Sequence, residues 1–169
     1  MILPIVKYGD PVLQKVCDPV KDFDQDLADL AKNIVETMYA APGYGLAAPQ
    51  VGVSKRLIVL DDSVGQKPGS LHVLVNPEII NHEGEQCEEE GCLSVPDFTA
   101  KVRRPFRVVV SAQDVQGQHK IVEGQELLAR ILAHEIDHLD GVVFLEHLSS
   151  LKRDLIKRKI RKKVKAGEW

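Results

Sequence analysis

The apolar positions of the chain predict two helices before residue 141. From Asp24 they recur at helical spacing on one face. Asp24 is suited to cap the start of this helix, and Pro42-Gly43 is suited to end it. A second helical segment, residues 124–140, has apolar residues on more than one side, which is typical of a buried helix. We therefore expect one amphipathic helix that covers the core and one helix at its centre.

Shorter apolar runs between Gly, Pro and Asp residues predict strands. These runs are residues 57–60, 71–75, 78–81, 107–112 and 119–123. The last two are expected to form a hairpin across Gly117. Residues 2–20 carry three prolines and predict an extended arm with turns, and residues 61–70 predict a surface loop. Small β-sheets packed around a central buried helix make the expected fold class α+β.

Length and composition indicate a single soluble domain over residues 1–169. The chain is 44% hydrophobic and 28% charged, which is typical of globular proteins. No apolar run approaches the ~20 residues that cross a bilayer, and the start lacks the basic residues of a secretion signal. We therefore expect a cytoplasmic protein that does not enter a membrane.

The buried helix carries the spacing His-Glu-x-x-His at residues 134–138. Residues four apart lie on one helix face, so His134 and His138 can offer two imidazole nitrogens to one metal ion. Glu135, beside the first of them, could take and return protons from a water that the ion activates. The alternative is a helix with two ordinary surface histidines.

A catalytic site of this kind needs a third protein ligand. Metzincins place a histidine three residues after the glycine of the motif, but Phe144 stands at that position after Gly141. The glutamates downstream, Glu146 and Glu168, flank a basic tail, so an upstream ligand is favoured. The upstream candidates are several acidic residues, His72, His82, His119, Cys17, Cys87 and Cys92.

Cys92 stands out among these candidates because it follows Gly91, where the backbone can be approached closely. A thiolate is a soft, anionic ligand that suits Zn or Fe(II) beside imidazoles. The alternative is a small buried hydrophobe, the common role of a single cysteine, which fits Cys87 better. Because three cysteines are an odd number in a chain of this size, we expect reduced thiols rather than disulfides.

A third stretch, Gly43 to Gln50, is rich in Gly and Ala. Such residues leave the backbone bare, as is needed where a peptide-like ligand hydrogen-bonds to the main chain. Gln50 closes the stretch with an amide donor. The alternative is a flexible connector, although the stretch lacks the Ser and charged residues of typical linkers.

Together, three stretches resemble the motifs of the peptide deformylase family in order and separation. They are Gly43-Tyr44-Gly45-Leu46-Ala47-Ala48-Pro49-Gln50, Glu90-Gly91-Cys92-Leu93-Ser94 and His134-Glu135-Ile136-Asp137-His138. The segment from Ile2 to Leu13 is also similar to that family, so the resemblance covers essentially the whole chain.

The resemblance implies one divalent metal ion held by Cys92, His134 and His138, natively Fe(II), with Zn(II), Ni(II) or Co(II) able to occupy the site. Glu135 would be the general base for water and then the acid that protonates the leaving amine. The oxyanion that develops on the formyl group would be met by the Gln50 side-chain amide, the Leu93 backbone N–H and the metal. The products would be formate and a free N-terminal methionine.

The resemblance also implies where an N-formyl-methionyl nascent peptide would lie. Its backbone would pair with Gly45 and the segment near Glu90-Gly91. Its methionine side chain would enter an apolar pocket formed around Tyr44, Leu127, Ile131 and His134. Arg130 stands where the family usually has an aliphatic residue, and Phe98-Thr99 stand where it often has Arg or an aromatic residue. Glu90 with Arg104 matches a structural ion pair of the family.

Residues 148–169 predict a basic C-terminal helix that resembles that of the bacterial class, which docks on the ribosome. Residues 151–169 carry nine Lys or Arg and two Asp or Glu, a net charge of +7, and the body carries −10. A cationic helix of this kind suits rRNA phosphates near the exit tunnel, where the substrate emerges. The alternative is a solvated helix that only caps the domain. We expect a monomer.

Two other functions are compatible with parts of the sequence. A small zinc peptidase would share the His-Glu-x-x-His helix, but its third ligand would be His or Glu, and Cys92 argues against it. A non-catalytic RNA-binding or ribosome-binding module would hold a structural metal with a closed fourth ligand.

Overall fold

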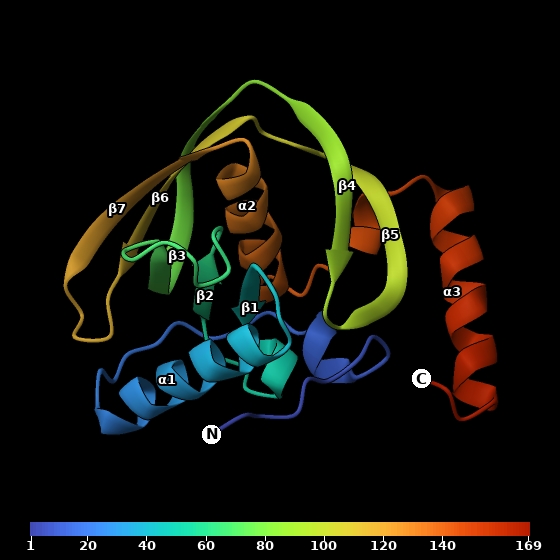
Figure 1. Cartoon of the computed structure of the whole chain (residues 1–169), viewed down its shortest axis with the longest axis horizontal. Coiled ribbons are helices and arrows are strands. Elements are labelled where there is room, and N and C mark those ends of the chain that lie inside the picture. Colours follow the sequence, from blue (N-terminus) through green and yellow to red (C-terminus); the bar gives the residue numbers. More distant parts are fainter.

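The structure, a computed structural model that describes all 169 residues, is built from two antiparallel sheets and three α-helices (Figure 1). The larger sheet has the strand order β1-β2-β3-β6-β7, and β4 pairs with β5 in the smaller one. The strands are β1 (Gly45–Ala47), β2 (Leu57–Asp61), β3 (Leu71–Glu83), β4 (Gln86–Cys92), β5 (Val95–Arg104), β6 (Arg107–Gln113) and β7 (His119–Gln125). The expected α+β class is confirmed.

Helix α2 (Leu127–Leu139) lies between the two sheets, as the predicted central helix should. Its apolar residues, among them Leu132, form one core with residues of β2, β3, β6 and β7 such as Leu60 and Val110. Burial on several sides explains why its apolar pattern is not confined to one face. The helix begins at Leu127, not at residue 124 as predicted, because residues 124 and 125 still belong to β7.

Helix α1 (Gln25–Ala40) covers the core from outside, and the Asp24 carboxylate accepts a hydrogen bond from the Leu27 N–H at 3.0 Å. This confirms Asp24 as the N-cap. The third helix, α3 (Ser150–Lys165), follows a short 3-10 turn, η3 (Phe144–His147), and lies at one side of the molecule (Figure 1). Two further 3-10 turns are η1 (Pro11–Gln14) and η2 (Ala48–Val51).

Two strand predictions were incomplete. Residues 71–75 and 78–81 form one continuous strand, β3, because a bulge absorbs Pro77 while Asn76 adopts a positive φ of 51°. Strands β1, β4 and β5 were not predicted; in β4, the run of glutamates before Glu90 shows no alternation of apolar and polar residues. Cys87, predicted to be a buried hydrophobe, is exposed because it lies on the solvent-facing part of β4. All three cysteines are free thiols, as expected.

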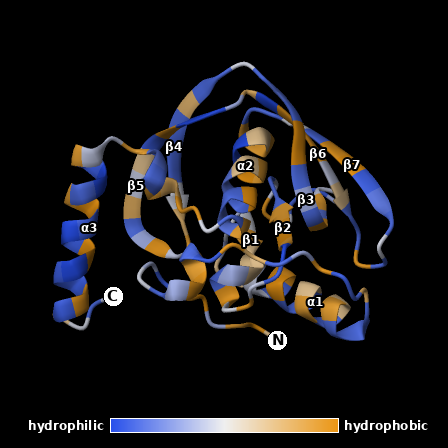
Figure 2. Cartoon of the chain, turned by 180° about the vertical axis from the view of Figure 1, so that it is seen from behind, coloured by the Kyte–Doolittle hydropathy of each residue, from blue (hydrophilic) through white to orange (hydrophobic).

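A separate apolar cluster joins α3 to the smaller sheet. Ile160 is buried there against residues of β5 and η3, and Trp169 donates from its indole N–H to the Tyr8 carbonyl oxygen at 2.8 Å. The rest of α3 is mostly hydrophilic, as Figure 2 shows. No helix in the chain combines the length and the apolar character that a membrane crossing requires.

Candidate metal centre and active site

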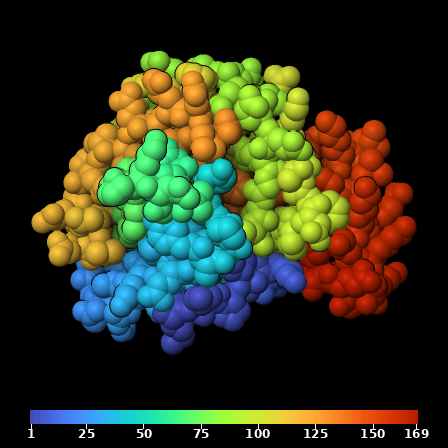
Figure 3. All heavy atoms as spheres, in the orientation of Figure 1, coloured from blue at the N-terminus to red at the C-terminus, as the bar shows by residue number.

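A cleft of about 610 Å³ opens between the smaller sheet, α2 and the segment that leads into β1 (Figure 3). It brings together the three sequence stretches that lie far apart in the chain. Of the twelve predicted site residues, eleven line it, namely Tyr44, Gly45, Gln50, Glu90, Gly91, Cys92, Leu93, Leu127, Ile131, His134 and Glu135. The twelfth, His138, is fully buried beneath them.

Three of these side chains gather their donor atoms in one place. His134 and His138 lie one turn apart on α2, with ring centroids 5.0 Å apart, and Cys92 ends β4 beside them. The Cys92 Sγ lies 3.5 Å from the His138 Nε2, and the ligand atoms of all three residues lie within 4.8 Å of one another. The two histidines of the helix and the upstream Cys92 thiol therefore form one cluster.

The surroundings of this cluster fit one metal ion. The His134 Nδ1 is 2.9 Å from Glu90 Oε1, which fixes the ring and leaves Nε2 free to bind a metal ion. Two nitrogens and one sulfur are the donor set that Zn(II) and Fe(II) accept, and three protein ligands leave a position open for substrate chemistry. These observations agree in favouring a catalytic rather than a closed structural site.

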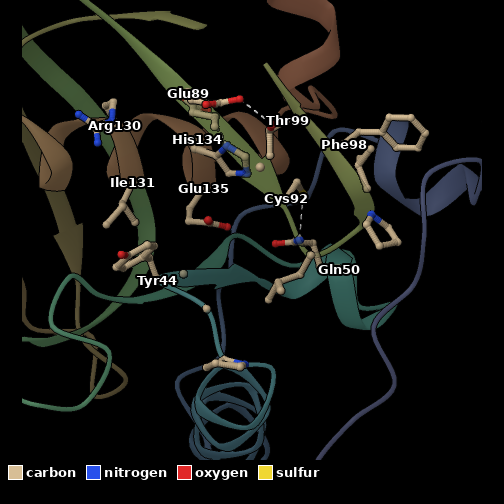
Figure 4. A pocket seen from close by; sticks show the side chains of 18 of the residues that line it. Tyr44, Gln50, Glu89, Cys92, Phe98, Thr99, Arg130, Ile131, His134 and Glu135 are labelled. Atoms are coloured by element: carbon tan, nitrogen blue, oxygen red, sulfur yellow. Dashed lines mark hydrogen bonds and ion pairs between the residues drawn. The ribbon is translucent and has the colours of Figure 1, made fainter. Parts of the chain in front are cut away.

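The carboxylate of Glu135 points into the cleft next to the cluster (Figure 4). The residue is 5% exposed, and its Oε1 has no hydrogen-bond partner within the protein. Burial raises the pKa of Glu135 to about 7. A carboxyl group in that range can both accept and return a proton near neutral pH.

Gly45 is the residue of β1 that makes room for this carboxylate. A Cβ at position 45 would lie 2.8 Å from Glu135 Oε2 and 2.9 Å from its Cγ, closer than such atoms normally approach. Position 45 therefore has to be glycine for Glu135 to keep its place. The sequence indicated a bare backbone here but not this contact.

Gln50 is held in a single orientation by hydrogen bonds at both ends of its amide. Its Oε1 accepts from the Ala47 N–H at 2.9 Å, and its Nε2 donates to Ser94 Oγ at 3.1 Å and lies 3.5 Å from Cys92 Sγ. The amide donor therefore faces the cluster (Figure 4). The neighbouring Leu93 N–H, in the turn between β4 and β5, has no acceptor in the chain. Sequence reasoning missed Ser94, whose hydroxyl orients the Gln50 amide.

Glu90 lines the cleft and also forms a buried ion pair that supports the site. Its carboxylate accepts from Arg104 Nε at 2.9 Å and from Arg104 Nη2 at 3.0 Å, so the expected ion pair is present. Burial opposes ionisation, but hydrogen bonds from His134 and Arg104 lower the pKa of Glu90 to about 2. The side chain thus connects the His134 ring to a buried guanidinium.

At two positions the wall of the cleft carries a polar side chain where a purely apolar pocket would have an apolar one. Arg130 lines the helix side of the cleft together with Leu127 and Ile131, and its guanidinium donates to Gln86 Oε1 at 2.9 Å. Thr99 Oγ1 donates to Glu89 Oε1 at 2.7 Å across the smaller sheet (Figure 4). These are the two positions where the sequence departs from the family pattern.

Comparison with known proteins agrees with the three motifs. A family model described as Polypeptide deformylase matches residues 2–154. The peptide deformylase of Acidobacterium capsulatum is 55% identical over 169 residues, which cover 100% of this chain and 99% of that protein.

Solved structures give the same result for the fold. The peptide deformylase of Legionella pneumophila superposes with a TM-score of 0.92 at 44% identity, covering 99% of this chain and 98% of that one. That of Thermus thermophilus superposes with a TM-score of 0.88 at 40% identity, with the same coverage of 99% and 98%. The chain belongs to the polypeptide deformylase family.

Proposed function

We propose that this chain removes the N-formyl group from the formyl-methionine of nascent polypeptides, using one metal ion held by Cys92, His134 and His138. The observation that carries the proposal is the position of Glu135, whose buried carboxylate lies in the same cleft as this ligand set, with Gly45 directly against it. Membership of the deformylase family supports the same activity.

When bound, a divalent ion supplies Lewis acidity, which makes water nucleophilic at neutral pH and polarises a carbonyl oxygen. Glu135 takes the proton of the attacking water as the new C–O bond forms at the formyl carbon. It then gives that proton to the leaving amine as the C–N bond breaks. The products are formate and the free N-terminal amine.

Gln50 and Leu93 act on the oxygen of the formyl group. Negative charge builds on this oxygen as water attacks, and donors that are already in place stabilise that charge best. The Gln50 amide is fixed by Ala47 and Ser94, and the Leu93 N–H is free to donate. Removing one donor of this type typically costs ~10²–10³ in rate.

The substrate backbone pairs with Gly45 on one side of the cleft and with the segment near Glu90-Gly91 on the other. The methionine side chain lies against Tyr44, Leu127 and Ile131, three residues that line the cleft together. Arg130 also lines the cleft, where its guanidinium is held by Gln86 Oε1. The native ion in our proposal is Fe(II), with Zn(II), Ni(II) or Co(II) as working substitutes, because the donor set suits all of them.

A small zinc peptidase is the alternative with the same helix. Such enzymes use His or Glu as the third ligand, whereas the residue that lies 3.5 Å from His138 here is Cys92. A non-catalytic module would have no use for a buried carboxylate without a partner beside the ligand set. Both alternatives are therefore less well supported.

We further propose that the whole chain acts as one cytoplasmic, monomeric catalytic domain, with residues 148–169 as a basic helix that docks on the ribosome. The argument rests on charge, because α3 displays unpaired cations on its exposed surface, among them Arg158, Lys159, Arg161, Lys162 and Lys165. Phosphate groups of rRNA attract such a surface.

The decisive assay follows formate release from formyl-Met-Ala-Ser and from unformylated Met-Ala-Ser. We expect release from the formylated peptide only, and a loss of about 10²–10⁴ in kcat for Glu135→Gln, because the general base is gone while the side-chain shape is kept. Metal analysis of the same variant should still find one ion per chain. Cleavage of internal peptide bonds without formate would instead establish the peptidase.

A further inference from the structure

A continuous chain of charged hydrogen bonds leads from the surface to the candidate metal ligand His134. At its outer end, His147 Nε2 lies 2.8 Å from Asp137 Oδ2, and the same oxygen accepts from Arg104 Nη1 at 2.6 Å. Arg104 holds both oxygens of Glu90, and Glu90 Oε1 lies 2.9 Å from His134 Nδ1. Four different elements, β4, β5, α2 and η3, supply these five residues.

The inner part of this network leaves its groups little freedom. The side chains of Arg104 and Glu90 are 4% and 7% exposed. Glu90 occupies the Nε and Nη2 of the guanidinium, so Nη1 needs another acceptor, and Asp137 provides it. Without the Asp137 acceptor, the Arg104 guanidinium is expected to rotate toward water, because leaving a buried charge unpaired is costly.

Asp137 and His134 are both on α2, three residues apart, so the hydrogen-bond network begins and ends on the same helix. It leaves the helix at Asp137, passes through Arg104 and Glu90, and returns to the helix at His134. The ring of His134 is thus fixed to its own helix at two points, the backbone and the carboxylate of Glu90. His147, in the turn after α2, fixes the Asp137 carboxylate from the outside.

We propose that Asp137 and His147 are positioning residues that orient the metal ligand His134 through Arg104 and Glu90. This inference rests on the proposed function, since it takes His134 as a ligand of the metal ion. The hydrogen-bond partners of a metal-ligating histidine fix its tautomer and ring orientation, and their loss typically costs ~10–100-fold in metal affinity or activity. Asp137 and His147 extend that effect outward by two further residues.

The test loads the metal-free protein with Co(II) and measures its affinity by competition with a chromophoric chelator. It also records the visible absorption spectrum, which depends on the geometry of the ligands. For Asp137→Asn we expect an affinity lower by on the order of 10-fold and a changed spectrum. For His147→Ala we expect a smaller change in the same direction, which His147→Gln reverses because it keeps an N–H donor.

Asp140→Asn is the matched control. Asp140 caps the same helix and pairs with Arg56 at 3.0 Å, but it takes no part in the network. It should leave Co(II) affinity and spectrum as in the wild type, even where it lowers the melting temperature.

The outcomes separate the inference from the function on which it rests. If the wild-type chain binds no stoichiometric Co(II), or Cys92→Ser binds as well as it does, the proposed metal site fails. If the wild type binds and Asp137→Asn and His147→Ala both keep its affinity and spectrum, the residues are only framework and the inference is overturned. Should Asp137→Asn not fold, the His147→Ala and His147→Gln pair decides alone.

Discussion

At the scale of single residues, the site depends on one close approach. The Glu135 carboxylate occupies the space where any other residue at position 45 would place its Cβ. No hydrogen bond within the protein holds Glu135 Oε1 in place. The close approach of Gly45 in β1 is therefore what restricts the position of this carboxylate. In the proposed mechanism, the glycine therefore acts on catalysis by setting the position of the general base Glu135.

Gly45→Ala should therefore lower kcat by on the order of 10²-fold, the cost of moving a reacting group by about 1 Å. The measurement is formate release under saturating formyl-Met-Ala-Ser, with the metal content checked in the same sample. Combined with Glu135→Gln, the substitution should add almost nothing, because the group it displaces has already been removed. A full additional loss in the double variant would show that Gly45 acts independently of Glu135.

At the scale of secondary-structure elements, the motif residues could be predicted from the sequence, but the smaller sheet that surrounds them could not. The helical period placed His134 and His138 on one face, because that depends on local geometry alone. The smaller sheet was missed because β4 exposes Cys87, Glu88 and Glu89 in succession and so has no alternating pattern. Its pairing with β5 and the turn that carries Leu93 follow from tertiary contacts.

The same reasoning explains which site residues escaped prediction. Asp137 and His147 are ten positions apart in sequence and meet only because the chain turns back after α2 at Gly141, whose φ is +76°. Ser94 stands within a recognised motif, but its bond to Gln50 joins the turn after β1 to the smaller sheet. Contacts of this kind depend on packing between elements, and no single segment encodes them.

The end of β2 illustrates how an element is held by one carboxylate. Asp61 Oδ2 accepts from Tyr39 Oη at 2.6 Å and from the Gly65 N–H at 3.0 Å, and Oδ1 accepts from the Ser63 N–H at 2.8 Å. Although burial opposes it, these bonds keep the pKa of Asp61 below its ordinary value. The loop after β2 is therefore fastened to α1 through an ionised group.

Asp61→Asn should reduce the free energy of unfolding at pH 7 by about 2 kcal/mol, since an amide cannot accept from both oxygens. Because the native pKa is lowered, this stability is present above the unfolded-state pKa of about 3.9 and is lost as pH falls through the native one. Denaturant unfolding at pH 7, pH 5 and pH 3 should thus show the difference shrinking only at the lowest pH. The exposed neighbour gives the control, Asp62→Asn, which should change stability little at any of these pH values.

At the scale of the whole molecule, charge is divided between two parts. The body is acidic and contains the cleft, whereas α3 is cationic and stands beside the smaller sheet (Figures 1 and 3). Only Ile160 of α3 is buried, and Leu151, Leu155 and Val164 stay exposed. Some of its cations are tied to the body, for example Lys157 and Lys163, which pair with Glu146 and Asp97. The others face solvent.

This division allows docking to be separated from catalysis. The variant replaces four exposed cations of α3, Arg158, Arg161, Lys162 and Lys165, with glutamate, and leaves Ile160 and the paired lysines in place. If α3 docks on rRNA, ribosome affinity should fall, and the slope of log affinity against log salt should decrease by about one for each phosphate contact removed. Turnover of free formyl-Met-Ala-Ser should not change, because none of the four residues lines the cleft.

The matched control reverses four exposed lysines elsewhere on the body, Lys15, Lys21, Lys32 and Lys67, so that both variants change net charge equally. Co-sedimentation with ribosomes at several salt concentrations measures both. A loss confined to the α3 variant would assign the docking surface to that helix. An equal loss in both variants would mean that the ribosome senses only total charge, and unchanged binding in both would make α3 a solvated cap on the domain.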